Sequence, residues 1–106
     1  MGISTDDITE LKHNLMEQFR NELPVLRARA RASQEVLCII CTELCMEHGI
    51  SRQTYSGIET GKREMTWTIF LALLAFFQNN EQTKTMIDQI NGFGDSMTKV
   101  MESPEH

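Results

Sequence analysis

The sequence contains no apolar run of 18 residues, so it offers no segment long enough to span a membrane. Its first residues lack the charged and apolar regions of a signal peptide, and Asp6 stands where a myristoylation motif after Met1-Gly2 needs Ser or Thr. Cysteine is scarce, and three cysteines without an export signal indicate reduced thiols. We therefore expect a cytoplasmic protein with no membrane partner.

The residue sets that catalysis needs are also missing. The chain has no Ser-His-Asp set, no phosphate-cradling glycine loop and no carboxylate pair in an evident cleft. Its three histidines have no recognisable partners. The sequence therefore predicts neither an enzyme nor a cofactor.

Helical patterns fill the 106 residues, a length that suits one domain, and no stretch alternates apolar and polar residues as a strand would. Apolar residues recur every three to four positions from Ile8 to Phe19, and we expect Pro24 to end that helix and begin the next. Further helices are expected to begin after Ser33, Ser51, Thr66 and Asn80. Gly92 and Gly94 are expected to precede a frayed tail, disordered over residues 103–106.

The stretch Ile50–Arg63 is the most informative part of the chain, because a short helix there carries polar side chains and ends in a glycine and two cations. Ser51 can cap this helix, and Tyr55 and Ile58 are interpreted as core residues. The side chains suited to reading the edges of DNA bases are Arg52, Gln53 and Ser56. The two cations that follow directly are suited to phosphate.

This stretch resembles the recognition helix of the lambda-repressor/Cro-like (Xre-type) helix-turn-helix family. The resemblance is carried by Ser33-Gln34-Glu35, Gly49-Ile50-Ser51 and Ile58-Glu59-x-Gly61-Lys62-Arg63. More loosely, Leu23-Pro24-Val25-Leu26-Arg27 and the run from Trp67 to Phe77 also fit. It implies an all-α helix-turn-helix bundle with extra N- and C-terminal helices. The expected parts are an amphipathic helix over residues 1–20, the DNA-binding domain over 21–78, and a helical extension with a disordered tail over 79–106.

The resemblance and the residue types together give a set of expected DNA contacts. The residues expected to contact bases are Arg52, Gln53, Ser56 and Gly57, although glycine offers only its backbone. The residues expected to contact phosphate are Ser51, Thr54, Thr60, Lys62, Arg63 and Gln34. Glu59 is expected to orient a neighbour such as Arg27 rather than touch DNA.

The function that this implies is sequence-specific binding of double-stranded DNA by a transcriptional regulator, more often a repressor, with Ser51–Thr60 as recognition helix. The family's usual two-fold dimer on a palindromic operator agrees with the helix from Trp67 to Phe77, which is apolar nearly all round. The expected homodimer interface consists of Phe70, Leu74 and Phe77. Burial of this helix under the terminal helices of the same chain is the alternative.

The net charge of −5 is unusual for a protein that binds nucleic acid, but the charge is unevenly distributed. Residues 20–63 carry seven Lys or Arg against five acids, whereas residues 1–19 sum to −3 and residues 64–106 to −4. Phosphate contact depends on the local potential. The charge pattern is therefore compatible with DNA binding through the middle of the chain.

Fifteen residues separate Ser33 from Gly49, seven more than the family's usual second helix needs. Seven residues are nearly two helical turns, so one long helix with a turn at Gly49 could keep the same face inward while moving Gln34 by ~10 Å. Alternatively, Thr42–His48 is the true second helix. The single long helix is favoured. In either arrangement, the phosphate contact of Gln34 is the least certain of the expected DNA contacts.

Two other functions remain open. Cys38, Cys41, Cys45 and His48 share one helix face, which could indicate a thiol or metal sensor. However, Cys38 and His48 would lie ~15 Å apart on a continuous helix, too far to bind one ion, so buried core cysteines are favoured. The other function is an antitoxin-type module, in which the terminal helices bind a partner protein and DNA binding is autoregulatory.

Overall fold

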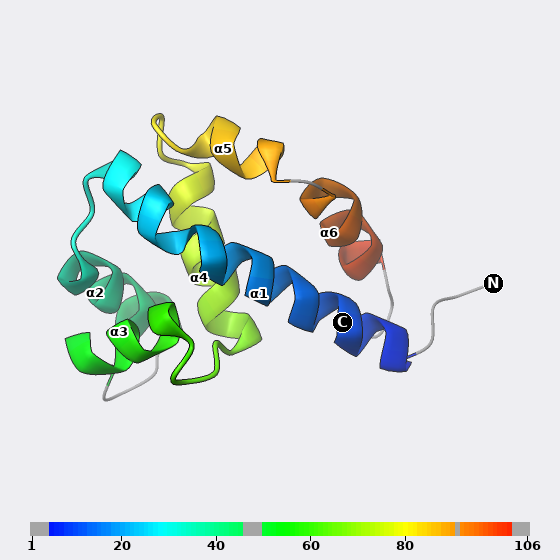
Figure 1. The fold of residues 1–106 in the computed structure, drawn as a ribbon, viewed down its shortest axis with the longest axis horizontal. Coiled ribbons are helices and arrows are strands. Elements are labelled where there is room, and N and C mark those ends of the chain that lie inside the picture. The colour runs from blue at the N-terminus through cyan, green and yellow to red at the C-terminus, as the bar shows by residue number, and fades with distance from the viewer. Residues whose placement is uncertain (1–4, 46–49, 91, 103–106) are drawn as a thin grey trace.

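The computed structural model describes residues 5–45, 50–90 and 92–102, and all the regular structure in these ranges is helical (Figure 1). The helices are α1 (Thr5–Ala30), α2 (Gln34–Cys45), α3 (Arg52–Thr60), α4 (Trp67–Gln78), α5 (Lys84–Gln89) and α6 (Phe93–Glu102). The expected all-α class is confirmed. Within the described ranges, no helix combines the length and the apolar character needed to cross a membrane.

Helix α1 runs unbroken across the whole molecule, so the prediction that Pro24 ends a helix is wrong (Figure 1). An internal proline removes one backbone hydrogen bond and crowds the preceding turn, at a cost of ~3 kcal/mol. That cost is offset because the apolar stripe continues past the proline: Leu15, Phe19, Leu23 and Leu26 are all fully buried. Each such side chain contributes ~1.5–3 kcal/mol. The division expected between residues 20 and 21 thus falls inside α1.

Side-chain caps begin the helices that surround the candidate site, as the sequence predicts. The Ser51 hydroxyl accepts a hydrogen bond from the amide of Thr54 at 3.1 Å. The Thr66 hydroxyl accepts one from the amide of Ile69 at 3.2 Å. At the start of α2, Ser33 accepts from Val36 at 3.1 Å. Each cap satisfies an amide that would otherwise lack a helical partner, which fixes where the chain turns into α2, α3 and α4.

Aromatic rings from three helices form the centre of the core. Phe19 of α1 lies edge-on to Phe70 of α4, with ring centroids 5.2 Å apart, and Phe93 of α6 approaches Phe70 at 6.1 Å. Residues 93–102 therefore form a helix, and the prediction that a frayed tail follows Gly92 and Gly94 is wrong for them. The tail expected to be disordered over residues 103–106 lies outside the described residues. Phe93 and Val100 are buried because α6 packs against α1. The sequence did not predict this contact, because Gly92 and Gly94 indicated the end of the helical region.

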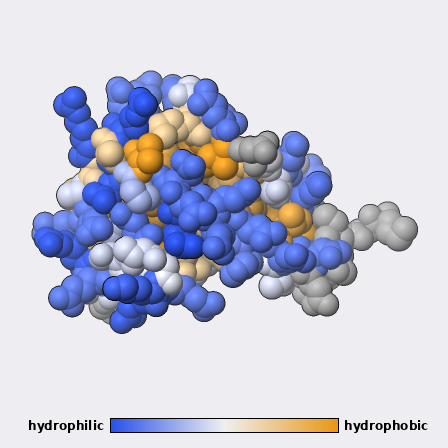
Figure 2. All heavy atoms as spheres, viewed as in Figure 1, coloured by the Kyte–Doolittle hydropathy of each residue, from blue (hydrophilic) through white to orange (hydrophobic). Residues whose placement is uncertain are grey.

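Helix α2 continues to Cys45 and packs against both α3 and α4. This favours the single longer helix over a second helix that begins at Thr42. The expected turn glycine, Gly49, lies outside the described residues. Most of the surface seen in Figure 2 is polar, and apolar side chains emerge in small groups.

Candidate nucleic-acid interface

Helix α3 presents one side to the core and the other to solvent. Its core side consists of Tyr55, Ile58 and Glu59, all buried. At 100° per residue, four of the five remaining polar positions fall within an arc of about 100°, and Thr54 lies outside it. This outward face consists of Arg52, Gln53, Ser56 and Thr60, of which Ser56 is half-buried and the others are exposed. The residues expected to read bases therefore share one accessible surface, and Thr60 joins them there.

Gly57 has a structural role that the sequence did not indicate. A Cβ atom at this position would lie 3.2 Å from Cγ and 3.3 Å from Cδ of Arg63, so the aliphatic part of Arg63 occupies the space that a side chain would fill. The Gly57 carbonyl also accepts hydrogen bonds from the amides of Lys62 at 2.8 Å and Arg63 at 3.0 Å. Gly57 thus holds the following cations against the end of α3.

Gly61 ends α3 in the left-handed conformation, with φ at 86°, as a helix-terminating glycine typically does. A Cβ atom here would lie 2.8 Å from a guanidinium nitrogen of Arg20, which reaches across from α1. Arg20, Lys62 and Arg63 together line an open cavity of about 340 Å³ between α1 and the loop after α3. Arg20 is a cation that sequence reasoning missed, because its proximity to Gly61 depends on how α1 packs on α3.

The hydroxyl groups expected to bind phosphate are engaged within the chain. The Ser51 hydroxyl caps α3 and lies 3.1 Å from that of Thr54. Thr60 donates to the carbonyl of Ser56 at 2.9 Å. Thr60 must give up this donated bond to reach phosphate, and so must whichever of Ser51 and Thr54 donates to the other. These residues are therefore weaker candidates than the exposed Lys62 and Arg63.

Gln34, whose placement the sequence left uncertain, lies at the same surface as the start of α3. It is half-buried and lines an open hollow of about 370 Å³. The other residues that line this hollow are Arg27, Ser33, Glu35 and Arg52. Two guanidinium groups and an amide thus gather where α1, α2 and α3 meet.

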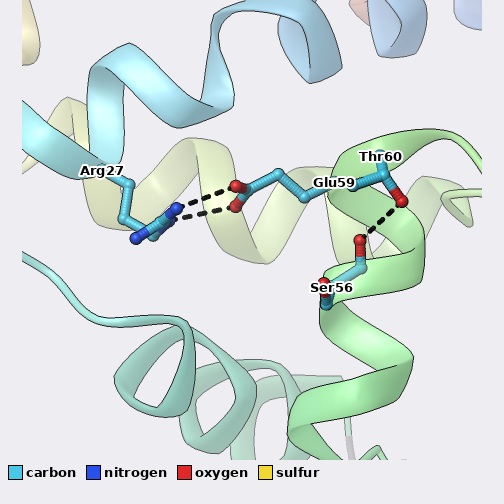
Figure 3. A network of polar contacts seen from close by, with 4 residues as sticks. All are labelled: Arg27, Ser56, Glu59 and Thr60. Carbon is cyan, nitrogen blue, oxygen red and sulfur yellow. Dashed lines mark hydrogen bonds and ion pairs between the residues drawn. The ribbon is translucent and has the colours of Figure 1, made fainter.

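An ion pair joins α1 to α3 behind the outward face (Figure 3). Arg27 donates from Nε to Oε2 of Glu59 at 3.1 Å and from a terminal nitrogen to Oε1 at 3.0 Å. This hydrogen-bonded contact with Glu59 raises the pKa of the Arg27 guanidinium. The expectation that Glu59 orients Arg27 is confirmed. Because bidentate pairs are geometrically specific, this one fixes the rotation of α3 against α1.

Tyr55 lies beside this pair with its hydroxyl buried. Among the described residues, that hydroxyl oxygen has no hydrogen-bond partner. Burial, and then the neighbouring carboxylate of Glu59, raise the pKa of Tyr55 far above its ordinary value. The phenol therefore stays neutral, and the ring serves as a core anchor for α3.

The cysteines contribute to packing. Cys38 and Cys41 are buried, and the thiol of Cys38 donates to the carbonyl of Ile50 at 2.7 Å, which ties α2 to the residue before the α3 cap. The Cys45 side chain and His48 lie outside the described part of the chain. Across the residues that the structure describes, no three His, Cys, Asp or Glu side chains could hold a metal ion together.

The side chains expected at a dimer interface are buried inside the single chain. Phe70 and Phe77 are 0% exposed and Leu74 is 3% exposed. Ring contacts with Phe19 of α1 and Phe93 of α6 account for part of this burial. The observed packing is the alternative in which the chain's own terminal helices cover α4, so these three residues offer no surface to a second subunit.

A scan against models of known protein families finds no match to this chain, and neither a search of curated proteins nor a search of solved structures finds one.

Proposed function

We propose that this protein binds double-stranded DNA in a sequence-specific manner and regulates transcription, with α3 as the helix that enters the major groove. One observation carries the proposal: Arg52, Gln53 and Ser56 share the outward face of a helix whose opposite face is anchored in the core. The major groove admits an α-helix, and Arg and Gln pair bidentately with guanine and adenine, respectively. Occupation of a promoter by such a protein would most simply block transcription, so we propose a repressor.

Three further features support this assignment. The ion pair between Arg27 and Glu59 holds α3 in one orientation, which base reading requires because each bidentate contact tolerates little displacement. Lys62 and Arg63 are exposed directly after the helix, where cations can contact the DNA backbone on one side of the groove. Gln34 and Arg27 lie by the other end of α3, beside Arg52.

The proposal concerns one chain that reads one half-site. A palindromic operator with half-sites ~34 Å apart would require two copies. Those copies would have to meet through a surface other than Phe70, Leu74 and Phe77, because these residues are already buried within the chain.

The proposal can be tested by selecting preferred duplexes from a randomised DNA library with the full chain and then measuring affinities by fluorescence anisotropy at several salt concentrations. Arg52→Ala should weaken binding to the selected duplex by ~1–3 kcal/mol and relax the preference at one base pair. Lys62→Ala should weaken binding to all duplexes alike and lower the slope of log K against log salt by about 1.

Lys84→Ala serves as the matched control for Lys62→Ala. Lys84 is an exposed lysine at the start of α5, on a different element from the proposed interface, and its removal should leave both affinity and salt slope unchanged. The proposal is overturned if the wild-type chain shows no salt-dependent binding to any duplex, or if Lys62→Ala and Lys84→Ala behave alike.

A further inference from the structure

Helix α2 is apolar on two opposite sides. A helix with this pattern is usually covered by other protein surface on both sides. Leu37 and Cys41 are fully buried toward the core. On the other side, Val36 is 43% exposed and Ile39 is 52% exposed, and they account for two of the four large apolar side chains most exposed among the described residues. At 100° per residue, Val36, Ile39, Ile40 and Glu43 fall within an arc of about 100°. The outer side of α2 is therefore an apolar strip.

This strip continues into a groove between α2 and the end of α4. The open groove has a volume of about 420 Å³. The residues that line it are Ile40, Glu43, Ala75, Phe76, Asn79 and Asn80. We call this surface, together with Val36 and Ile39, the α2–α4 groove. None of its residues belongs to the proposed DNA interface, so the two surfaces can act independently.

The charges around the groove indicate what it would accept. Glu43, the one charged residue that lines the groove, is exposed, and α2 carries no Lys or Arg along its described length. The far rim, Asn79 and Asn80, is polar and uncharged. A partner with an apolar stripe between basic residues would cover the apolar strip and complement Glu43.

A second copy of the same chain fits this surface less well. A two-fold interface places the same patch on both sides, so it would bring Glu43 of one copy toward Glu43 of the other. Like charges in contact across an interface are costly. Charge complementarity therefore favours a different, basic partner.

We propose that the α2–α4 groove docks an amphipathic helix of a partner protein, whose apolar residues repeat at i, i+3, i+4 and i+7 and are flanked by Lys or Arg. The apolar side of the partner helix would contact Ile39 and Phe76, and its cations would face Glu43. This goes beyond DNA binding, because it gives the chain a second, separate recognition surface through which another protein could be held.

The test uses a fluorescein-labelled peptide of about 18 residues, long enough to be helical when bound, with a leucine stripe flanked by lysines. A twin peptide carries glutamates in place of the lysines. We expect saturable binding of the lysine peptide to the full chain, and an affinity for the glutamate peptide at least about tenfold lower. Ile39→Gln should weaken binding of the lysine peptide about tenfold or more, because it removes the most exposed apolar side chain of the strip.

Two variants make the test specific. Val25→Gln is the matched control, since Val25 is 49% exposed on α1 but does not line the groove, and this variant should bind the lysine peptide as the wild type does. Glu43→Lys should reverse the preference, so that the glutamate peptide binds better than the lysine peptide. All six side chains substituted in the DNA and peptide tests are exposed. We therefore expect these variants to keep the core intact, which helical circular dichroism should verify.

Three results would each overturn the inference: no saturable binding of the lysine peptide, equal loss of binding in Ile39→Gln and Val25→Gln, or retained preference in Glu43→Lys. Analytical ultracentrifugation adds a fourth. A dimer that forms in the wild type and dissociates in Ile39→Gln would mean that a second copy covers the groove. The titration contains no DNA, so failure of this inference and failure of the proposed DNA binding are separately visible.

Discussion

The ion pair between Arg27 and Glu59 allows the sharpest test of how α3 is held. Glu59→Gln removes the negative charge but keeps the shape. Arg27 donates to both carboxylate oxygens, at 3.0 and 3.1 Å, and the amide has only one oxygen to accept, so one hydrogen bond is lost and the other loses its charge assistance. The Glu59 side chain is 5% exposed, whereas that of Arg27 is 27% exposed and can recruit water after the change. We therefore expect a loss of ~1–3 kcal/mol in the free energy of unfolding, below the range for a fully buried pair.

A double-mutant cycle separates this pair from other effects. The cycle combines Glu59→Gln with Arg27→Met, and urea unfolding is followed by circular dichroism and by the fluorescence of Trp67, the single tryptophan. We expect a coupling energy of ~1–2 kcal/mol, because each single variant already removes most of the interaction.

The pair of Glu17 and Arg20 provides the matched control. It has the same hydrogen-bond length, 3.0 Å, but the Glu17 side chain is 53% exposed and both residues lie on α1. Its coupling should be only ~0.3–0.5 kcal/mol. If the Arg27–Glu59 cycle is additive to within about 0.5 kcal/mol, the pair does not hold α3 in place and the reasoning is refuted.

Three further changes test individual residues. Tyr55→Phe should leave stability at pH 7 unchanged or raise it by ~1 kcal/mol, because the buried hydroxyl has no partner among the described residues. Since the folded pKa of Tyr55 is raised above its ordinary value of about 10, its contribution to stability is present below that pH and is lost as the pH rises further, so the wild type should lose stability above pH ~10 more steeply than Tyr55→Phe. Tyr55 is the only tyrosine, so near-ultraviolet absorbance should detect tyrosinate only when the wild-type chain unfolds, and ionisation of the folded chain near pH 10 would contradict its burial. Gly61→Ala should destabilise the chain by ~1–2 kcal/mol in thermal unfolding, because φ is 86° and the new Cβ meets Arg20, and an unchanged midpoint would contradict this. Arg31→Gly should stabilise the chain by ~0.5–1 kcal/mol in urea unfolding, because Arg31 has a φ of 57° after α1, and a loss of stability would show that its side chain has a role of its own.

Local chemistry was sufficient to predict the surroundings of α3. Its cap at Ser51 and its core residues Tyr55 and Ile58 follow from capping preference and from helical periodicity, which act over a few residues. The pairing of Glu59 with Arg27 was also predicted, from the resemblance of the surrounding motif. The DNA-contacting roles of the outward residues stay predictions.

Longer-range packing explains the expectations that were wrong. Proline usually ends a helix that it interrupts. Pro24 nevertheless lies within α1, because Leu23 before it and Leu26 after it continue the apolar stripe that is buried in the core. Similarly, two glycines made the C-terminal segment resemble a tail, whereas burial of Phe93 and Val100 against other helices stabilises α6. Neither compensation is visible in the local sequence.

The sequence by itself thus determined the all-helical class, the starts of α2, α3 and α4, and the inward and outward faces of α3, because helical periodicity and capping are local properties. Only the tertiary structure decided that the terminal helices bury Phe70, Leu74 and Phe77, that Arg20 lies against Gly61, and that α2 keeps an apolar strip in solvent. These outcomes depend on which helix covers which face. That choice is made by the total apolar surface buried when the whole chain folds, and it is therefore settled only in three dimensions.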